Sequence, residues 1–320
     1  KIFIILMNIL ITGGAGFIGS HLCEKLLSNK ENKIIGIDNI NDYYDRQQKF
    51  NNLDILKKFS NFTFYEDDIC TTKIIDIFKP EIVVNIAAMA GVRYSVNNPT
   101  ICMRVNVEGQ INLLKQCVDN NVKLFVYASS SSVYGKNTKV PFQEDDKLDK
   151  INSPYAASKM CSEILAGTYH RLYGLKTIGL RFFTVYGPRG RPDMAPYKFL
   201  NAIYQNKKFD KYGNGETYRD YTYVDDIVNG IIGAIKNKKN KDCEVYNLGN
   251  SKPITLNEFI KTCEKVTGKK AIFNQLPDQK GDVPKTYADI TKAKNDLDYN
   301  PKVSFEDGLR KTYEWLSNKS

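Results

Sequence analysis

The chain has 320 residues and a formal net charge of +10, and this length can bury a sizeable core, as one large domain or as a domain with a smaller partner. Its positive charges are spread along the chain instead of forming a stripe, so we expect no nucleic-acid partner. The apolar run Lys1–Ile11 is too short to cross a bilayer and leads directly into a glycine turn. We therefore expect neither a signal peptide nor a membrane anchor, and Met7 has the character of a natural start.

Cysteine and histidine usage excludes several kinds of site. The seven cysteines form an odd set without a Cys-x-x-Cys pair, which argues against a disulfide framework or a zinc site and favours a reducing, cytoplasmic location. Only His21 and His170 are present, and neither stands in a ligand or triad arrangement. We therefore expect no metal and no Ser-His-Asp chemistry.

The first element of the chain is a buried strand, Met7–Thr12, followed by the glycine turn Gly13–Gly19 and a helix from about residue 17 to 28. This order forms the cradle in which backbone amides and a helix N-terminus meet a dinucleotide pyrophosphate. A second strand ends at Asp38, 19 positions after Gly19, where a carboxylate would accept hydrogen bonds from the adenosine ribose. A 2′-phosphate would be repelled there, so the sequence predicts NAD and not NADP.

Strands and helices then alternate, which predicts an α/β fold with a Rossmann-type, doubly wound parallel sheet. The predicted strands are 33–37, 62–65, 82–86, 123–127 and 176–182, and the predicted helices are 72–79, 99–120 and 154–173. Beyond Thr184 the chain becomes loop-rich, with packing helices near 255–267 and 305–316. We therefore predict an NAD-binding Rossmann domain over residues 1–183 that includes the helix 154–173, and a smaller α/β substrate lobe over 184–320, with some segments returning to the first domain.

Ligands of such sheets bind beyond the carboxyl ends of the strands. The predicted cofactor contacts are accordingly Gly13, Gly16, Phe17, Ile18, Gly19, Asp38, Asn39, Asp68, Ile69, Ala87 and Ala88, together with Tyr155 and Lys159. The serine run Ser129–Ser132 ends another predicted strand at the same edge. These residues define one predicted site along a single edge of the sheet.

Tyr155 and Lys159 stand four positions apart on a predicted helix, and so project side by side. Ser153 and Pro154 support this helix as an N-cap followed by proline at the first helical position. An adjacent ammonium favours the phenolate, so we expect Lys159 to lower the pKa of Tyr155. The pair is a candidate base for taking a proton from a sugar or alcohol hydroxyl. A Tyr-x-x-x-Lys pattern arises easily by chance. The catalytic interpretation of the pair depends on the glycine turn, which predicts a bound dinucleotide.

The glycine turn, the serine run and the Tyr155/Lys159 pair are similar to those of extended short-chain dehydrogenases that act on nucleotide-sugars. More specific blocks resemble the UDP-glucuronate 4-epimerases: 38–45, 90–95, 128–135, 181–194, 219–226 and 281–289. They follow one another in the expected order over nearly the whole chain. The resemblance implies NAD-dependent, reversible 4-epimerisation of UDP-glucuronate to UDP-galacturonate through a 4-keto sugar.

By that resemblance, Tyr155 is the acid and base, Lys159 orients the nicotinamide ribose, and Ser130 hydrogen-bonds the reacting hydroxyl. The cofactor leaves as it entered, so no net oxidation is expected. The resemblance also implies a homodimer formed by the helix that carries Tyr155 and the long helix before it. A two-fold pairing of this kind is the commonest oligomer geometry.

The serine run separates related reactions. A 4,6-dehydratase of this superfamily resembles the chain but carries an Asp-Glu pair where Ser131 and Ser132 stand, and a decarboxylase carries a Glu in that run. The missing carboxylates disfavour both reactions. We expect Ser131, Ser132 and Thr184 to hold the sugar carboxylate out of alignment with the 4-keto group, which prevents loss of carbon dioxide. Related galactose epimerases have Asn at the position of Thr184.

The remaining predicted substrate contacts lie toward the UDP end. A guanidinium fork matches phosphate oxygens, which makes Arg191 and Arg219 candidates for the pyrophosphate. By resemblance, Asp282 contacts the uridine ribose and Arg93 belongs to the substrate site. Gln279 replaces an Arg of the galactose epimerases, which is a departure from their pattern.

Other functions stay open from the sequence. One is a 4-epimerase for UDP-glucose or UDP-N-acetylglucosamine, and a less favoured one is a UDP-glucuronate decarboxylase. Outside enzymes, the chain could be a silent NAD-sensing scaffold, although such proteins typically lose the Tyr or the Lys.

Overall fold

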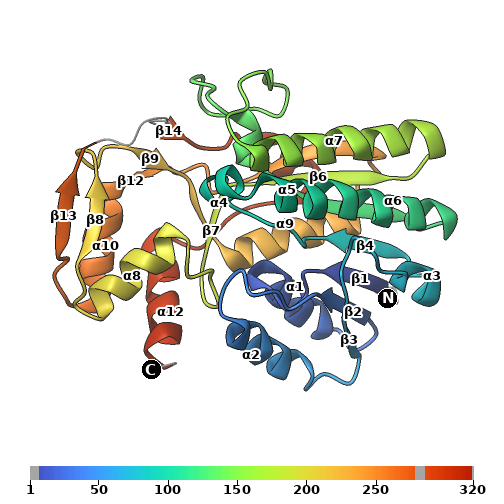
Figure 1. Cartoon of the computed structure of the whole chain (residues 1–320), viewed down its shortest axis with the longest axis horizontal. Helices are drawn as coiled ribbons and strands as arrows, with labels where there is room; N and C mark the ends of the chain where they lie inside the picture. Colours follow the sequence, from blue (N-terminus) through green and yellow to red (C-terminus); the bar gives the residue numbers. More distant parts are fainter. Residues whose placement is uncertain (1–6, 278–284, 319–320) are drawn as a thin grey trace.

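A computed structural model of the chain describes residues 7–277 and 285–318. Within these residues a seven-stranded sheet forms the centre, in the order β11-β6-β5-β4-β1-β2-β3, and every neighbouring pair is parallel (Figure 1). Its strands are β1 (Asn8–Thr12), β2 (Lys33–Asp38), β3 (Phe62–Glu66), β4 (Ile82–Asn85), β5 (Leu124–Ser130), β6 (Thr177–Phe182) and β11 (Cys243–Leu248). The predicted doubly wound α/β fold is confirmed.

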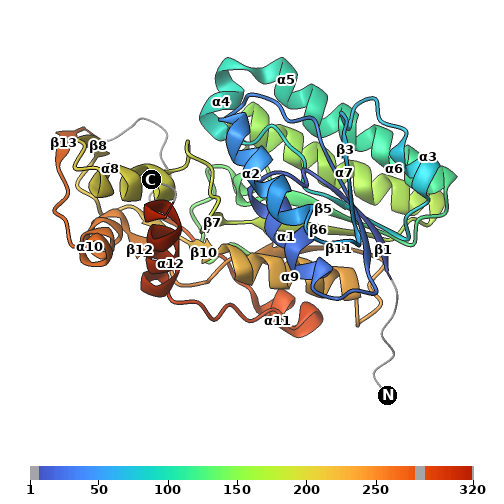
Figure 2. The same ribbon diagram turned by 90° about the horizontal axis from the view of Figure 1, so that it is seen from below.

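Helices cover both faces of this sheet, which is why its central strands read as continuous apolar runs. The helices of this layer are α1 (Phe17–Leu27), α2 (Arg46–Leu56), α3 (Ile74–Phe78), α4 (Val92–Asn97), α5 (Pro99–Met103), α6 (Gly109–Asp119), α7 (Pro154–Tyr173), α9 (Val224–Lys236) and α11 (Thr291–Leu297). Figure 2 shows α1 and α9 on one side of the sheet and α3, α6 and α7 on the other. Along β1, Ile9 and Ile11 belong to the apolar cluster that includes residues of α1 and α9, whereas Leu10 belongs to the cluster that includes residues of α3, α6 and α7.

The helix predicted over 99–120 is interrupted. A π-helical turn, Arg104–Glu108, separates α5 from α6. Asn106 lies in this turn and accepts a hydrogen bond from Met89 N at 2.8 Å, while its Nδ2 donates to Met89 O at 3.1 Å. A π-turn often marks a functional segment, and this one fixes the backbone of a residue that lines the cavity described below.

The second lobe lies beside the carboxyl ends of the sheet strands (Figure 1). It contains β7 (Thr184–Tyr186), β8 (Phe209–Tyr212), β9 (Tyr218–Arg219), β10 (Tyr221–Tyr223), β12 (Ile254–Thr255), β13 (Phe273–Leu276), β14 (Lys285–Thr286), α8 (Ala195–Tyr204), α10 (Leu256–Thr267) and α12 (Phe305–Ser317). The two predicted packing helices are confirmed as α10 and α12. Helix α10 begins with a capping box in which Thr255 and Glu258 satisfy each other's backbone amides.

Strand β11 and helices α9 and α11 come from beyond residue 184, yet they belong to the layers of the large sheet. The division into domains at residue 183 stays a prediction. In the described residues, no helix is both long and apolar enough to cross a membrane.

Candidate active site

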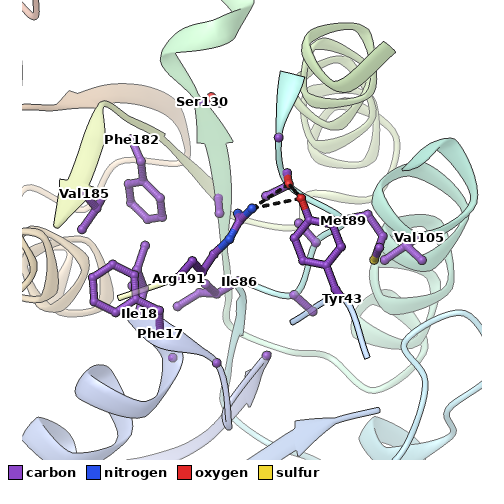
Figure 3. A pocket seen from close by; sticks show the side chains of 18 of the residues that line it. Phe17, Ile18, Tyr43, Ile86, Met89, Val105, Ser130, Phe182, Val185 and Arg191 are labelled. Carbon is purple, nitrogen blue, oxygen red and sulfur yellow. Dashed lines mark hydrogen bonds between the residues drawn. The ribbon is translucent and has the colours of Figure 1, made fainter. Parts of the chain in front are cut away.

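A cavity of about 350 Å³ opens at the carboxyl ends of the sheet strands. Most of the predicted site residues line it: Gly13, Gly16, Phe17, Ile18, Gly19, Asp38, Asn39, Ile69, Ala87, Ala88, Ser130, Ser131, Ser132, Tyr155, Lys159, Thr184 and Arg191. In Figure 3, Ser130 stands at the end of β5, and Arg191 reaches across the cavity toward Tyr43. The fold therefore gathers into one place residues that are far apart in the sequence.

The glycine turn between β1 and α1 is built for close backbone approach. Gly13 has φ +68°, a conformation that side chains rarely adopt, and Gly16 N donates to Gly13 O at 3.0 Å. A Cβ added at Gly19 would lie 2.1 Å from Gly13 O, so no larger residue fits there. The turn leaves backbone amides at the N-terminus of α1 beside the cavity, which fits a dinucleotide pyrophosphate.

Asp38 has a buried partner that the sequence reasoning missed. Its Oδ1 accepts hydrogen bonds from Ile40 N at 2.9 Å and from Lys49 Nζ at 3.1 Å, and the Lys49 side chain is only 5% exposed. Lys49 Nζ also lies 3.1 Å from Asn41 Oδ1. Asp38 Oδ2 lies 4.0 Å from the place where a Cβ on Gly16 would be, beside the glycine turn. Lys49 compensates the negative charge of Asp38. The net repulsion between this site and the 2′-phosphate of NADP is therefore weaker than we expected.

Helix α2, which carries Lys49, also holds a loop of the second lobe. Gln48 Nε2 donates to Arg189 O at 2.7 Å and to Gly190 O at 3.1 Å, immediately before Arg191. Asn52 Nδ2 donates to Ala15 O in the glycine turn at 2.9 Å. One polar helix face thus contacts the cofactor end of the cavity and the loop that supplies Arg191.

Asp68 is the predicted cofactor contact that is absent from the described cavity lining. Its neighbours Asp67 and Ile69 do line the cavity. Its Oδ1 accepts from Cys70 N at 2.8 Å, and its Oδ2 accepts from Asn39 Nδ2 at 3.5 Å. Asp68 therefore contacts the cavity only indirectly, through its hydrogen bond with the lining residue Asn39.

The predicted catalytic pair, Tyr155 and Lys159, lies on α7, which begins at Pro154 as predicted, and the Ser153 side chain accepts a hydrogen bond from Ala156 N at 3.1 Å. Lys159 is buried, and its Nζ donates to Ala128 O at 2.7 Å. Ser130 caps the 3-10 turn Ser131–Tyr134, because its Oγ accepts from Ser132 N at 3.1 Å. The Oγ atoms of Ser130 and Ser132 are 3.2 Å apart.

Burial dominates the electrostatics of the pair. It raises the pKa of Tyr155, while a hydrogen bond with Ser130 and the charge of Arg191 act in the opposite direction. Burial also lowers the pKa of Lys159 to about 8. The pKa of Tyr155 thus lies above its ordinary value, contrary to the expectation that it is lowered, because desolvation of the phenolate outweighs the Ser130 hydrogen bond and the charge of Arg191.

Arg191 spans the cavity from the loop after β7. Its Nη2 donates to Ala90 O at 3.0 Å and to Tyr43 OH at 3.1 Å (Figure 3). Nη2 and Nε also bind the Asp193 carboxylate, at 2.6 and 3.0 Å. The guanidinium also lies 5.0 Å from the centre of the Tyr43 ring. Binding a pyrophosphate here would exchange some of these partners for phosphate oxygens. Tyr43 lies within a block quoted above but was not singled out.

The other predicted substrate residues lie elsewhere. Arg219, on β9, donates to Tyr218 O at 2.8 Å and is absent from the described cavity lining. Arg93 lies on α4 with an exposed side chain, next to Val92, which lines the cavity. Asp282 and Gln279 fall outside the described residues.

The two ends of the cavity differ in chemistry. Among its described lining residues the carboxylates are Asp38, the last residue of β2, and Asp67, which follows β3, both at the predicted cofactor end. The region around Tyr155 instead offers the hydroxyls of the serine run and of Thr184. This arrangement can move a proton at a sugar hydroxyl, but it lacks the paired carboxylates that an elimination needs.

Comparison with known proteins gives one consistent result. Residues 10–312 match the sequence model of a family described as GDP-mannose 4,6 dehydratase. A UDP-glucuronate 4-epimerase of Thermodesulfobacterium geofontis is 45% identical over 312 residues, covering 96% of this chain and 95% of that protein. Protein CapI of Staphylococcus aureus is 44% identical over 331 residues, covering 97% and 98%.

A solved structure is similar over nearly the whole chain. The crystal structure of UDP-glucuronic acid 4-epimerase from Bacillus cereus, in complex with UDP-glucuronic acid and NAD, superposes with a TM-score of 0.93 and 36% identity, covering 98% of this chain and 100% of that one. The sequence motifs, the fold and these relatives agree. The chain belongs to the nucleotide-sugar epimerase and dehydratase family of extended short-chain dehydrogenases, which the GDP-mannose 4,6 dehydratase model describes and which includes the UDP-glucuronate 4-epimerases.

Proposed function

We propose that this protein is an NAD-dependent UDP-glucuronate 4-epimerase that interconverts UDP-glucuronate and UDP-galacturonate. The observation that carries the proposal is the hydroxyl-lined end of the cavity, where Tyr155, Ser130 and Lys159 meet and no described carboxylate lines the wall. Two relatives support the choice of substrate. One, 45% identical, is named UDP-glucuronate 4-epimerase, and the other, 38% identical, is named probable UDP-glucuronate 4-epimerase.

In the proposed reaction, Tyr155 removes the proton of the sugar 4-hydroxyl as the 4-keto sugar forms. After that sugar has turned its other face to the cofactor site, Tyr155 returns a proton to the 4-oxygen, and C4 has the opposite configuration. Ser130 orients that hydroxyl, and Lys159 holds the nicotinamide ribose. NAD, held by the glycine turn, Asp38 and Lys49, supplies a reversible hydride acceptor when bound. Lys159 would exchange its present partner, Ala128 O, for ribose oxygens and for the developing phenolate. An ammonium beside Tyr155 then offsets the effect of burial on its pKa.

At the other end of the sugar, Ser131, Ser132 and Thr184 would bind the carboxylate of the substrate. The 4-keto intermediate is a β-keto acid, and it loses carbon dioxide only when the breaking bond aligns with the carbonyl π system. Three hydroxyl donors can hold the carboxylate out of that alignment. Arg191 would bind the pyrophosphate, with Arg219 as a second candidate. Asp282 is a candidate for the uridine ribose, and Arg93 for the substrate site.

Incubating the NAD-loaded protein with UDP-glucuronate and separating the products tests the proposal. We expect UDP-galacturonate, little UDP-pentose and no net accumulation of NADH, and Tyr155→Phe should abolish the conversion while retaining NAD. Conversion of UDP-glucose or UDP-N-acetylglucosamine but not of UDP-glucuronate would refute the assigned substrate. Bound NAD without turnover of any of the three would refute the enzyme assignment and favour a scaffold.

We also propose a homodimer formed through α6 and α7. These two helices lie side by side, and they present the exposed apolar side chains Ile111, Ile164, Leu172 and Tyr173 (Figure 1). Exposed apolar residues gathered on neighbouring helices are typical of an association surface. Sedimentation of the wild type and of Ile164→Arg tests this: a monomeric wild type, or an unchanged dimer in the variant, would refute the proposed surface.

A cytoplasmic location completes the proposal. It is supported by the four cysteines that lie buried as free thiols, Cys23, Cys102, Cys117 and Cys263, as is usual in reducing compartments. Fractionation of source cells with an antibody tests it.

A further inference from the structure

A buried ion pair that the proposed mechanism does not use lies directly behind the serine run. Arg181 on β6 binds Glu163 on α7 in a bidentate manner, with Nη2 2.8 Å from Oε2 and Nε 2.9 Å from Oε1. The two side chains are only 4% and 9% exposed. Such a geometry is specific as well as strong, and it fixes the two groups relative to each other.

Glu163 continues the face of α7 that carries the catalytic pair. Tyr155, Lys159 and Glu163 follow one another at spacings of four residues, so they project from one side of the helix. Three successive residues at the end of β5 meet them. Ala128 O accepts from Lys159, the Ser129 hydroxyl donates to Glu163 Oε1 at 2.5 Å, and Ser130 interacts with Tyr155.

Arg181 also holds the far end of the serine turn. Its Nη1 donates to Tyr134 OH at 2.9 Å and to Glu144 O at 3.1 Å, and Tyr134 OH in turn donates to Asn247 Oδ1 on β11 at 2.7 Å. Ser130 caps the start of the same turn. The turn that carries Ser131 and Ser132 is therefore fixed at both ends, and one buried guanidinium connects its far end to α7.

We propose that Glu163 and Arg181 are positioning residues, which lock the register of α7 against the end of β5 and so set the distance between Tyr155, Ser130 and the reacting hydroxyl. The proposal rests on the proposed epimerase function. A buried ion pair stabilises a fold little, because desolvating the two charges costs about as much as their attraction returns. Catalysis is far more sensitive, since a misplacement of about 1 Å can reduce a rate on the order of 100-fold.

The test compares the double variant Glu163→Met/Arg181→Met, which removes both charges together, with Ser129→Ala, which breaks only the contact between β5 and Glu163. Lys292→Met is the matched control, because Lys292 pairs with Glu244 at 2.8 Å on β11 and lies outside the described cavity lining. For each protein we would measure the melting temperature, kcat, KM and the fraction of enzyme trapped as NADH during turnover.

We expect the double variant to melt near the wild-type temperature and to keep its KM, while kcat falls roughly 100-fold. The NADH fraction should stay near that of the wild type, because a misplaced Tyr155 slows the removal and the return of the proton alike. Ser129→Ala should show a smaller loss of kcat, about 10-fold, at an unchanged melting temperature. The control should match the wild type.

A kcat within twofold of wild type in a folded double variant would overturn the proposal. If the double variant does not fold, Ser129→Ala decides, and a kcat within twofold there overturns it equally. A wild type that fails to convert UDP-glucuronate would instead refute the proposed function. The kcat values of the variants would then be compared on whichever UDP-sugar the wild type epimerises. If the wild type epimerises none, the compared quantity would be the rate at which UDP-glucose reduces the NAD bound to each protein.

Discussion

Replacing Lys159 by Met should make the protein more stable while removing its activity. Burial lowers the pKa of Lys159 from 10.5 to about 8, and a difference of this size corresponds to about 3 kcal/mol of unfavourable free energy whenever the lysine is charged in the folded state. Met has a similar length and no charge. It forfeits the hydrogen bond to Ala128 O, worth about 1 kcal/mol, so we expect a net gain of about 2 kcal/mol near neutral pH.

The pH dependence distinguishes this cause from simple repacking. Below about pH 8 the lysine is protonated in the folded and the unfolded protein, so the wild type carries the whole penalty. Between about pH 8 and pH 10.5 the unfolded chain binds more protons than the folded one, so wild-type stability rises with pH relative to the variant. The advantage of Lys159→Met should therefore be largest near neutral pH and disappear by about pH 10.5.

Urea unfolding of NAD-free wild type and Lys159→Met over this pH range measures the difference. Lys239→Met serves as the control, because that lysine is exposed and its replacement should change stability little at any pH. A difference between wild type and Lys159→Met that stays constant with pH would refute the reasoning, as would a variant that is less stable near neutral pH.

Three further changes test the two ends of the cavity. Thr184→Val removes one hydroxyl from the proposed carboxylate clamp and should raise the ratio of UDP-pentose to UDP-galacturonate several-fold, as product separation would show; an unchanged ratio contradicts the clamp. Lys49→Met leaves the Asp38 carboxylate without its buried partner. Calorimetric titration should show roughly 10-fold weaker NAD binding, which corresponds to about 1.4 kcal/mol. An NAD affinity within twofold of wild type would exclude a role for Lys49 in cofactor binding. Gly19→Ala places a Cβ 2.1 Å from Gly13 O, so the purified protein should lose most of its bound NAD while α1 still forms. Ultraviolet absorbance measures the bound NAD. Full retention of NAD would argue against a close approach of its pyrophosphate to the glycine turn.

Much of the fold could be predicted because its elements carry strong local patterns. Strands β1 and β4 each contain a run of three apolar residues, and α7 begins at a Ser-Pro pair that predicts its first residue. Helix α2 was missed for a physical reason. Its buried face carries Gln48, Lys49 and Asn52, so the apolar periodicity that indicates a helix is absent.

The same limit applies to the candidate site. Residues that sit at the ends of predicted strands were found, because parallel strands bring their carboxyl ends to one edge. Lys49, Glu163 and Arg181 could not be found, since a charged residue on a helix or strand ordinarily faces solvent and only tertiary contacts bury these three. The pKa of Tyr155 was misjudged because a rule for two neighbouring side chains omits burial.

The two neighbouring residues Gln48 and Lys49 predict an order of ligand binding, because both lie on α2. Lys49 reaches the adenosine end of the cavity, and Gln48 holds the loop that precedes Arg191. NAD seated against Lys49 would steady the helix and, through Gln48, the loop that receives the UDP-sugar. We therefore expect UDP to bind more weakly to the NAD-free protein, and equal affinity in both forms would contradict this. An epimerase must return the hydride to the same sugar it oxidised, and a single helix that couples the two sites keeps both reactants together until it does.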